Sequence, residues 1–150
     1  MSQDDLSSVV EFTNLVFRSS GLELTASAES GEEGPRVLVD GEDVALLLGH
    51  NAELLDALEY LGNRVSSRLS GEDGRIVFDS GNYRARRERE LRLMAEKAAE
   101  KVRSTHMAFS FDPMTANERR IIHLTLSEDS SVRTESRGDG ENRKLVIFPA

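Results

Sequence analysis

The stretch "TANERRIIHLTL" (115–126) decides how the second half of this 150-residue sequence folds. Pro113 interrupts regular structure just before it, because proline lacks the backbone N–H that a helix interior needs. Thr115 stands three residues before Glu118, which is the spacing of a capping box at the start of a helix. We therefore predict a helix over residues 115–126, closed at its N-terminus by these two side chains.

This predicted helix carries an apolar stripe and a cationic face. The stripe that can be buried consists of Ile121, Ile122 and Leu126. Arg119 and His123 are four residues apart and share one face, which Arg120 flanks. Arginine forks onto phosphates or stacks on bases, and protonated histidine donates to phosphates. The face favours an anionic ligand; the alternative is that Arg119 pairs with a carboxylate such as Asp112 and that His123 is partly buried.

Composition limits the classes of protein that this chain can belong to. It contains no cysteine, which excludes disulfides, thiolate zinc sites and cysteine nucleophiles. The acidic start "MSQDDLSSVVEF" lacks the pattern of a signal peptide, and the longest apolar run, residues 44–48, is too short to span a membrane. We therefore expect a soluble cytoplasmic protein without membrane insertion.

Charge is distributed unevenly along the chain, whose net charge is −8. Residues 1–80 contain 16 acidic and 5 basic residues, a balance of −11. Residues 81–150 contain 11 acidic and 14 basic residues, a balance of +3. Such an asymmetry suggests two domains with different partners, and a polyanion is expected to bind the second.

Apolar periodicity and turn residues predict a mixture of helices and strands. Before residue 81 the order is helix, strand, strand, helix, helix and strand, over residues 4–19, 21–28, 35–41, 42–49, 51–70 and 74–80. After it come a long helix, a second helix and a β-hairpin, over residues 82–109, 115–126, 131–138 and 143–149. The buried face expected on the helix over 51–70 consists of Leu54, Leu58, Leu61, Val65 and Leu69. This order indicates the α+β class, with domains over 1–80 and 81–150.

The first domain resembles a type II KH domain around "LLLGHNAELLDALEYL" (46–61). In that family a G-x-x-G loop between two helices clamps four backbone nucleotides. The corresponding loop here is Gly49-His50-Asn51-Ala52. The second glycine is missing, no permanent positive charge stands between, and Glu53 and Asp56 follow. The loop is therefore expected to be a tight turn, and the resemblance favours protein contacts over RNA clamping in this half.

The second domain resembles the R-three-H domain, which is named for an arginine and a histidine separated by three residues. The motif is Arg119-Arg120-Ile121-Ile122-His123. The hairpin "TESRGDGENRKLVI" (134–147) supplies the family's second part, a Ser-x-Gly turn followed by an arginine and a strand. Ser136, Gly138 and Arg143 are the matching positions. The capped helix, its spacing to the hairpin and the turn together make this resemblance specific.

A KH domain followed by an R-three-H domain is the arrangement of the bacterial Jag family, also called KhpB or EloR, which residues 20–149 resemble. The resemblance implies a non-catalytic RNA chaperone or post-transcriptional regulator that binds single-stranded RNA, and single-stranded DNA as a further ligand. It also implies a small KH protein, KhpA, as partner and a link to cell elongation and division. The binding residues that it implies are Arg119, Arg120, His123, Ser136, Arg137 and Arg143. Longer members carry an additional N-terminal domain, for which we expect no room here.

The arginine-rich start of the long helix has two interpretations. Arg84, Arg86 and Arg87 can form a stripe that positions phosphates, or they can pair with neighbouring carboxylates on a solvated face. The two are weighed equally.

Catalysis, metals and cofactors find no support in the sequence. The three histidines lack the spacing of metal ligands, and neither a G-x-S-x-G elbow nor a phosphate-cradling glycine loop occurs. The rival hypothesis to RNA binding is a protein–protein interaction module, in which the KH-like half is a scaffold and nucleic-acid binding is weak.

Overall fold

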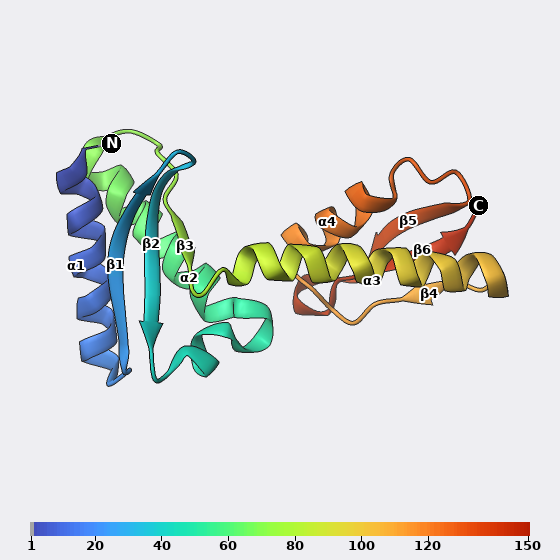
Figure 1. The fold of residues 1–150 in the computed structure, drawn as a ribbon, viewed down its shortest axis with the longest axis horizontal. Coiled ribbons are helices and arrows are strands. Elements are labelled where there is room, and N and C mark those ends of the chain that lie inside the picture. The colour runs from blue at the N-terminus through green and yellow to red at the C-terminus, as the bar shows by residue number, and fades with distance from the viewer. Residues whose placement is uncertain (1) are drawn as a thin grey trace. The chain divides into compact units, whose positions relative to one another are not determined.

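The computed structural model describes residues 2–150, which form two compact units that divide between Arg84 and Ala85. This division falls close to the boundary expected after residue 80. Both units combine helices with a three-stranded sheet, so the predicted α+β class is confirmed (Figure 1). Within residues 2–150, no helix reaches the combination of length and apolar character that crossing a bilayer requires.

The first unit has the KH-like order of elements. Its bounds are α1 (Gln3–Ser20), β1 (Leu24–Gly31), β2 (Gly34–Gly41), α2 (Val44–Ser70) and β3 (Val77–Asp79). The sheet order is β1-β2-β3, with β2 antiparallel to β1 and parallel to β3. The core is formed by apolar side chains from α1, α2 and all three strands, and α1 contacts both β1 and α2 (Figure 1).

The orientation of α2 corrects the predicted apolar face. From position 55 onward, the buried positions of this helix are Leu55, Leu58, Gly62 and Ser66. Of the predicted stripe only Leu58 is fully buried, whereas Leu61 and Leu69 are 43% and 55% exposed. The cause is Gly62, where an added Cβ would lie only 2.6 Å from Cζ of Phe78. The helix packs this small residue against the ring, and the face through Leu55, Leu58 and Gly62 is the one that enters the core.

The segment between the two predicted helices is an interruption inside α2. The backbone leaves helical geometry at Gly49 and then takes left-handed φ values of 52°, 57° and 60° at His50, Asn51 and Ala52. Left-handed backbone is unfavourable for residues that carry a Cβ. Ala52 is nevertheless buried in the core, which anchors the end of the turn, while His50 and Asn51 are exposed.

The second unit has a two-helix layer on one face of its sheet. Its bounds are α3 (Tyr83–Thr105), β4 (Phe109–Ser110), α4 (Ala116–Leu126), β5 (Val132–Arg137), the 3-10 turn η1 (Gly140–Asn142) and β6 (Lys144–Pro149), with α3 starting at the end of the first unit. The strand order is β4-β6-β5, and all pairs are antiparallel. The long helix ends four residues earlier than predicted, because His106 takes a left-handed φ of 57° and the chain turns into β4.

Asp129 stabilises the turn between α4 and β5. It accepts hydrogen bonds from the hydroxyl and the backbone N–H of Ser131, and Arg103 lies 2.6 Å away. The hydrogen bonds from Ser131, followed by the Arg103 charge, lower the pKa of Asp129 below its usual 3.8. A carboxyl with a lowered pKa stabilises the folded state above its unfolded-state pKa, and this contribution is lost as the pH falls through the folded-state pKa.

We therefore expect Asp129→Asn to lower the stability of the second unit at neutral pH, and the difference from the parent chain to shrink below about pH 3.8. Urea unfolding at several pH values measures this difference. Glu128→Gln, which changes an exposed neighbouring carboxylate, is the matched control. A difference for Asp129→Asn that stays constant into the acid range would contradict the expectation.

Candidate nucleic-acid interface

The predicted histidine of α4 lies against the neighbouring strand β5. Nδ1 of His123 is 2.5 Å from Oγ1 of Thr134, so the two side chains share a hydrogen bond. Thr134 is paired with Ile147, a buried core residue, and therefore lies on the sheet face that α3 and α4 cover. His123 is exposed, and its Nε2 forms no hydrogen bond within the residues that the structure describes. That nitrogen is thus available to a ligand.

The Ser-x-Gly turn of the hairpin is held by an arginine, as the motif predicts. Nε of Arg143 donates to Oγ of Ser136 at 3.0 Å, and Nη1 donates to the carbonyl of Gly138 at 3.2 Å. Gly138 has a φ of 92°, and an added Cβ would lie 2.9 Å from the carbonyl oxygen of Asn142. Only glycine fits here without strain, so the turn brings Ser136 and Arg143 together.

Arg119 is linked to the same hairpin through the residue that precedes the helix cap. Its Nη1 donates to the carbonyl of Met114 at 2.7 Å, and the N–H of Met114 donates to the carbonyl of Arg143 at 3.1 Å. Arg119 and Arg143 are both half-buried. Together these side chains form the helix–hairpin cluster, which consists of Arg119, His123, Thr134, Ser136 and Arg143.

Thr134 is the member of this cluster that the sequence analysis missed. The signal was present, because side chains two residues apart on a strand share a face, and Thr134 is two residues before Ser136.

Two further predicted residues do not join the cluster. Arg120 is exposed at the side of α4 and forms no ion pair or hydrogen bond within residues 2–150. Arg137 lies on the opposite face of β5 from Ser136, because neighbouring strand residues alternate. Its guanidinium instead lies 4.6 Å from the ring centroid of Phe148 and 3.2 Å from Glu135.

The arginines at the start of α3 differ in the partners that they contact. Arg84 donates from Nε to the carbonyl of Phe78 at 2.7 Å, and its Nη2 lies 3.0 Å from both Asp56 and Glu59. These contacts tie Arg84 to the first unit. Arg86 is exposed and has no hydrogen bond or ion pair among the described residues.

Arg87 has a structural partner in α4, and this changes the predicted capping box. Thr115 caps the helix as predicted, since its hydroxyl accepts from the N–H of Glu118 at 3.3 Å. The carboxylate of Glu118 does not return to Thr115 but accepts from Nε of Arg87 at 2.8 Å. Arg87 also lies 3.2 Å from Glu90. The capping box is therefore half-formed, and Glu118 joins α3 to α4 instead.

The loop at 49–52 presents little that would hold a phosphate. The two exposed residues are His50 and Asn51, the fourth position is the buried Ala52, and an exposed acidic residue, Glu53, follows. The geometry is compatible with the tight turn expected from the sequence.

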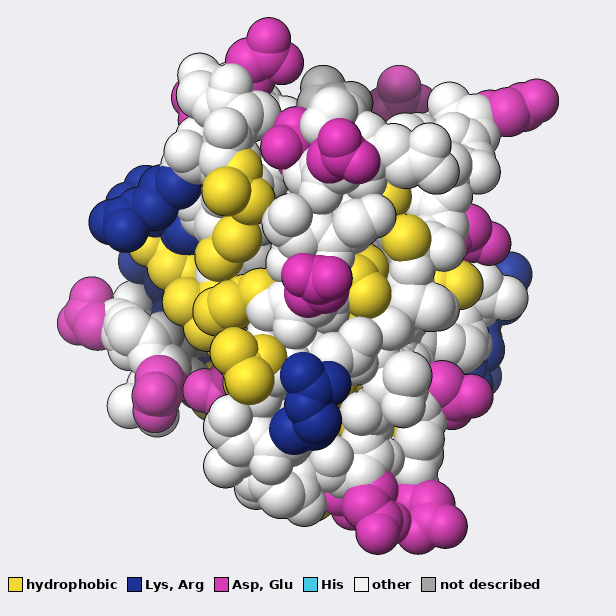
Figure 2. All heavy atoms as spheres, turned by 90° about the vertical axis from the view of Figure 1, so that its left-hand side faces the viewer, with side chains coloured by type: hydrophobic (Ala, Val, Ile, Leu, Met, Phe, Trp, Pro, Cys, Tyr) yellow, Lys and Arg dark blue, Asp and Glu magenta, His cyan; other side chains and the backbone are white. Residues whose placement is uncertain are grey.

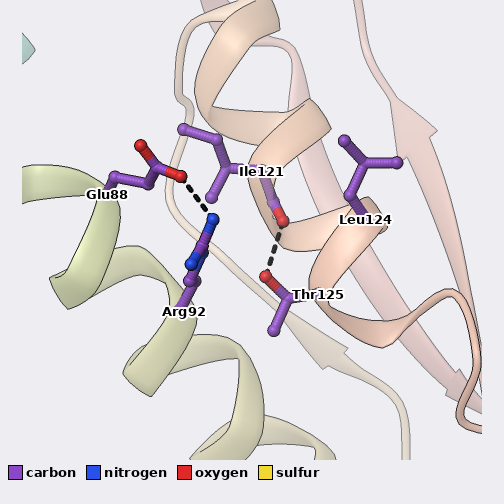
Figure 3. Close-up of a pocket in the computed structure, with 5 residues that line it drawn as sticks. All are labelled: Glu88, Arg92, Ile121, Leu124 and Thr125. Carbon is purple, nitrogen blue, oxygen red and sulfur yellow. Dashed lines mark hydrogen bonds and ion pairs between the residues drawn. The ribbon is translucent and has the colours of Figure 1, made fainter. Parts of the chain in front are cut away.

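A pocket of about 330 Å³ lies between α3 and α4 (Figure 3). It is lined by Glu88, Arg92, Ile121, Leu124 and Thr125. The two charged residues are paired with each other at 2.5 Å, and the Thr125 hydroxyl donates to the carbonyl of Ile121 at 2.7 Å. Because its polar groups already bond one another, this pocket gives no sign of the ligand it would select.

Comparisons with known proteins match the part of the chain that contains the helix–hairpin cluster. Residues 89–149, which include all five of its members, match the family model of the R-three-H domain. RNA-binding protein KhpB of Clostridium symbiosum is 35% identical over 140 residues, which are 92% of this chain and 63% of that protein. RNA-binding protein KhpB of Bacillus subtilis strain 168 is 37% identical over 123 residues, 81% of this chain and 59% of that protein. The chain thus spans about three-fifths of the length of these two relatives.

Proposed function

Because the chain belongs to the KhpB family and carries an R-three-H domain at residues 89–149, we propose that it is a non-catalytic protein that binds single-stranded RNA through the helix–hairpin cluster. The observation that carries this proposal is the pair of links between α4 and the hairpin. Arg119 bonds the carbonyl of Met114, whose N–H bonds the carbonyl of Arg143, and His123 bonds Thr134 on β5, two residues before Ser136. An RNA-binding regulator of this kind would act in the cytoplasm.

The chemistry of the cluster suits a phosphate and its sugar. Arg119 uses one N–H for the carbonyl of Met114 and keeps the rest of its fork for an anion. Nε2 of His123 can donate to a phosphate when it carries the proton. The hydroxyl of Ser136 accepts from Arg143 and can donate its own hydrogen to a phosphate or to a 2′-hydroxyl.

The test is the affinity for a labelled single-stranded RNA, measured by fluorescence anisotropy at several salt concentrations. The variant Arg119→Gln/His123→Asn replaces both side chains by uncharged amides, and circular dichroism checks that its fold is unchanged. We expect its affinity to fall about 30-fold, close to 2 kcal/mol. The negative slope of log affinity against log salt should become shallower by about 1.4, which is about 0.7 for each of two lost phosphate contacts.

The control is Lys97→Gln, which removes an exposed cation of α3 outside the cluster. Equal binding by the parent chain and the double variant would contradict the assignment of the site. Single-stranded DNA of the same sequence, used as a competitor, reports how far the 2′-hydroxyl contributes.

A second candidate function is protein–protein contact by the first unit. Its large exposed apolar side chains on α1 and α2 are Leu15, Leu46, Tyr60, Leu61 and Leu69. Apolar side chains gather on one end of this unit, with charged residues around them (Figure 2). A contiguous apolar surface favours a protein partner, and a small KH protein such as KhpA is the partner that we propose. Absence of RNA binding by the intact parent chain would favour this function over the first.

A further inference from the structure

The sheet of the second unit has an outer face that neither helix of this unit covers. Leu145 and Ile147 of β6 point into the core formed with α3 and α4. The residues between and beside them therefore point outward, as do their partners on β5. The outward pairs, from one end of the hairpin to the other, are Arg133 with Phe148, Glu135 with Val146, and Arg137 with Lys144.

An aromatic ring on this face is flanked by two arginines. The guanidinium carbons of Arg133 and Arg137 lie 4.3 and 4.6 Å from the centroid of Phe148. Glu135, between them on the strand, is 3.4 Å from Arg133 and 3.2 Å from Arg137. Lys144 adds a third cation, which has no ion pair among residues 2–150. Three cations thus face one carboxylate.

We propose that this face, the Arg133–Phe148–Arg137 stack with Lys144, is a second contact for single-stranded RNA, which continues onto it from the helix–hairpin cluster. The proposal rests on the proposed function, since it extends the path of the same strand. The two arginines remain 60% and 53% exposed although both are stacked and paired. They have N–H groups left for phosphates, and a guanidinium that lies over a ring can present its other side to a base.

The position of β5 makes the two surfaces continuous. β5 is an edge strand, so no neighbouring strand blocks the way from one face to the other. Ser136 of the cluster and Arg137 of the stack are consecutive residues that point to opposite faces. A nucleic-acid strand that leaves the cluster at Ser136 reaches Arg137 by passing around the edge of a single strand.

Charge complementarity favours a polyanion over other occupants of this face. Exposed ion pairs and cation–π contacts stabilise a fold only weakly, so stability alone does not explain two arginines over one ring and a lysine on the same face. An apolar peptide would have to displace them. The repeated negative charge and flat bases of a single strand match both parts of the surface.

The experiment compares a short RNA of about four nucleotides with a long one of about twelve, a range of lengths that single-strand modules occupy. In the full chain, Arg133→Gln/Arg137→Gln should leave the affinity for the short RNA unchanged. For the long RNA it should weaken binding about tenfold and reduce the salt slope by about 1.4. The matched control is Lys97→Gln/Lys101→Gln, which removes two cations of α3, one of them 5.5 Å from the Phe109 ring.

Arg133→Lys/Arg137→Lys separates charge from stacking. It should keep the salt slope but lose several-fold in affinity for the long RNA, because a lysine cannot stack as a plane.

Unchanged binding of the long RNA by the glutamine variant would overturn the proposal, as would equal weakening on both lengths. Binding of labelled polyglutamate by the parent chain but not by the glutamine variant, together with unchanged binding of the long RNA by that variant, would assign the face to acidic peptides and also overturn it. If the parent chain binds neither RNA, the proposed function itself fails, which is a different result from these.

Discussion

Replacing Arg87 by methionine is expected to lower the free energy of unfolding of the second unit by about 3 kcal/mol, the lower end of the range for breaking a buried ion pair. Glu118 is only 5% exposed, and Arg87 supplies its hydrogen bond at 2.8 Å. The other carboxylate oxygen of Glu118 is buried and has no hydrogen-bond partner among residues 2–150. Without the arginine, a buried carboxylate would therefore lose its compensating charge.

The pKa of Arg87 reflects the same balance of burial and pairing. Burial by itself would lower this pKa, but the hydrogen bond and charge of Glu118, with a smaller contribution from Glu90, raise it above its ordinary value. The ion pair therefore favours the charged guanidinium in spite of its loss of water. The penalty of the methionine variant arises mainly from the carboxylate that stays behind.

A second substitution tests this cause directly. Arg87→Met/Glu118→Leu removes both charges and should recover most of the lost stability, because an apolar pair can replace a buried ion pair at little cost. The matched control is Arg92→Met, which breaks an exposed pair with Glu88 on the same helix and should cost less than about 0.5 kcal/mol. Urea unfolding, with hydrogen exchange of the α4 amides, measures these differences.

An equal free energy of unfolding for Arg87→Met and Arg92→Met would show that the contact of Arg87 with Glu118 contributes little to stability. The contact matters for the candidate site, because Glu118 immediately precedes Arg119 on α4. A loosened α4 start should therefore also expose the amides at the base of the helix–hairpin cluster to exchange.

The parts of the site that the sequence predicted depend on short-range signals. Pro113 and Thr115 placed the start of α4, and the motif Ser136, Gly138 and Arg143 predicted a turn followed by an arginine and a strand; the structure adds that Arg143 bonds Ser136 across this turn. Each of these interactions joins residues of one segment. The types and order of its residues are therefore enough to specify it.

The parts that the sequence did not predict depend on distant partners. Glu118 satisfies the spacing of a capping box, but its carboxylate bonds Arg87 on another helix. For Arg84 the sequence left a phosphate contact and pairing with nearby carboxylates equally open, and its actual partners, Asp56 and Glu59, lie more than 20 residues earlier in the chain. The strand β4 has two residues, too few for a periodic pattern. Arg137, which the sequence analysis grouped with the other binding residues, does not depend on a distant partner. Side chains alternate along a strand, so Arg137 and Ser136, as neighbours, lie on opposite faces of β5.

The predicted face of α2 failed for a reason of volume. Counting leucines favoured the stripe through Leu61 and Leu69, whereas the packed surface centres on a glycine that admits an aromatic ring. Hydrophobic periodicity weighs each apolar side chain but gives no weight to a missing one. Hydrophobic periodicity therefore cannot predict the close packing of Gly62 against Phe78, although this packing sets the orientation of the helix.

Gly62→Val is accordingly expected to destabilise the first unit by about 3 kcal/mol. A Cβ at this position would lie 2.6 and 2.8 Å from two ring atoms of Phe78 and 3.2 Å from Cγ1 of Val9. Both neighbours are fully buried, so neither can move into open space. Valine is a better helix former than glycine by a few tenths of a kcal/mol, which offsets little of the clash.

Ala57→Val, at an exposed position of the same helix, is the matched control and should cost about 0.5 kcal/mol through helix propensity alone. Gly62→Ala/Phe78→Leu should be more stable than the sum of its single variants predicts, because the smaller side chain makes room for the new methyl group. Strict additivity, or equal losses for the two valine variants, would contradict the packing argument.

Phe78 also donates its N–H to Glu59 and accepts from Arg84 at the start of α3. Displacing its ring should therefore raise hydrogen exchange at the end of the first unit as well as in its core.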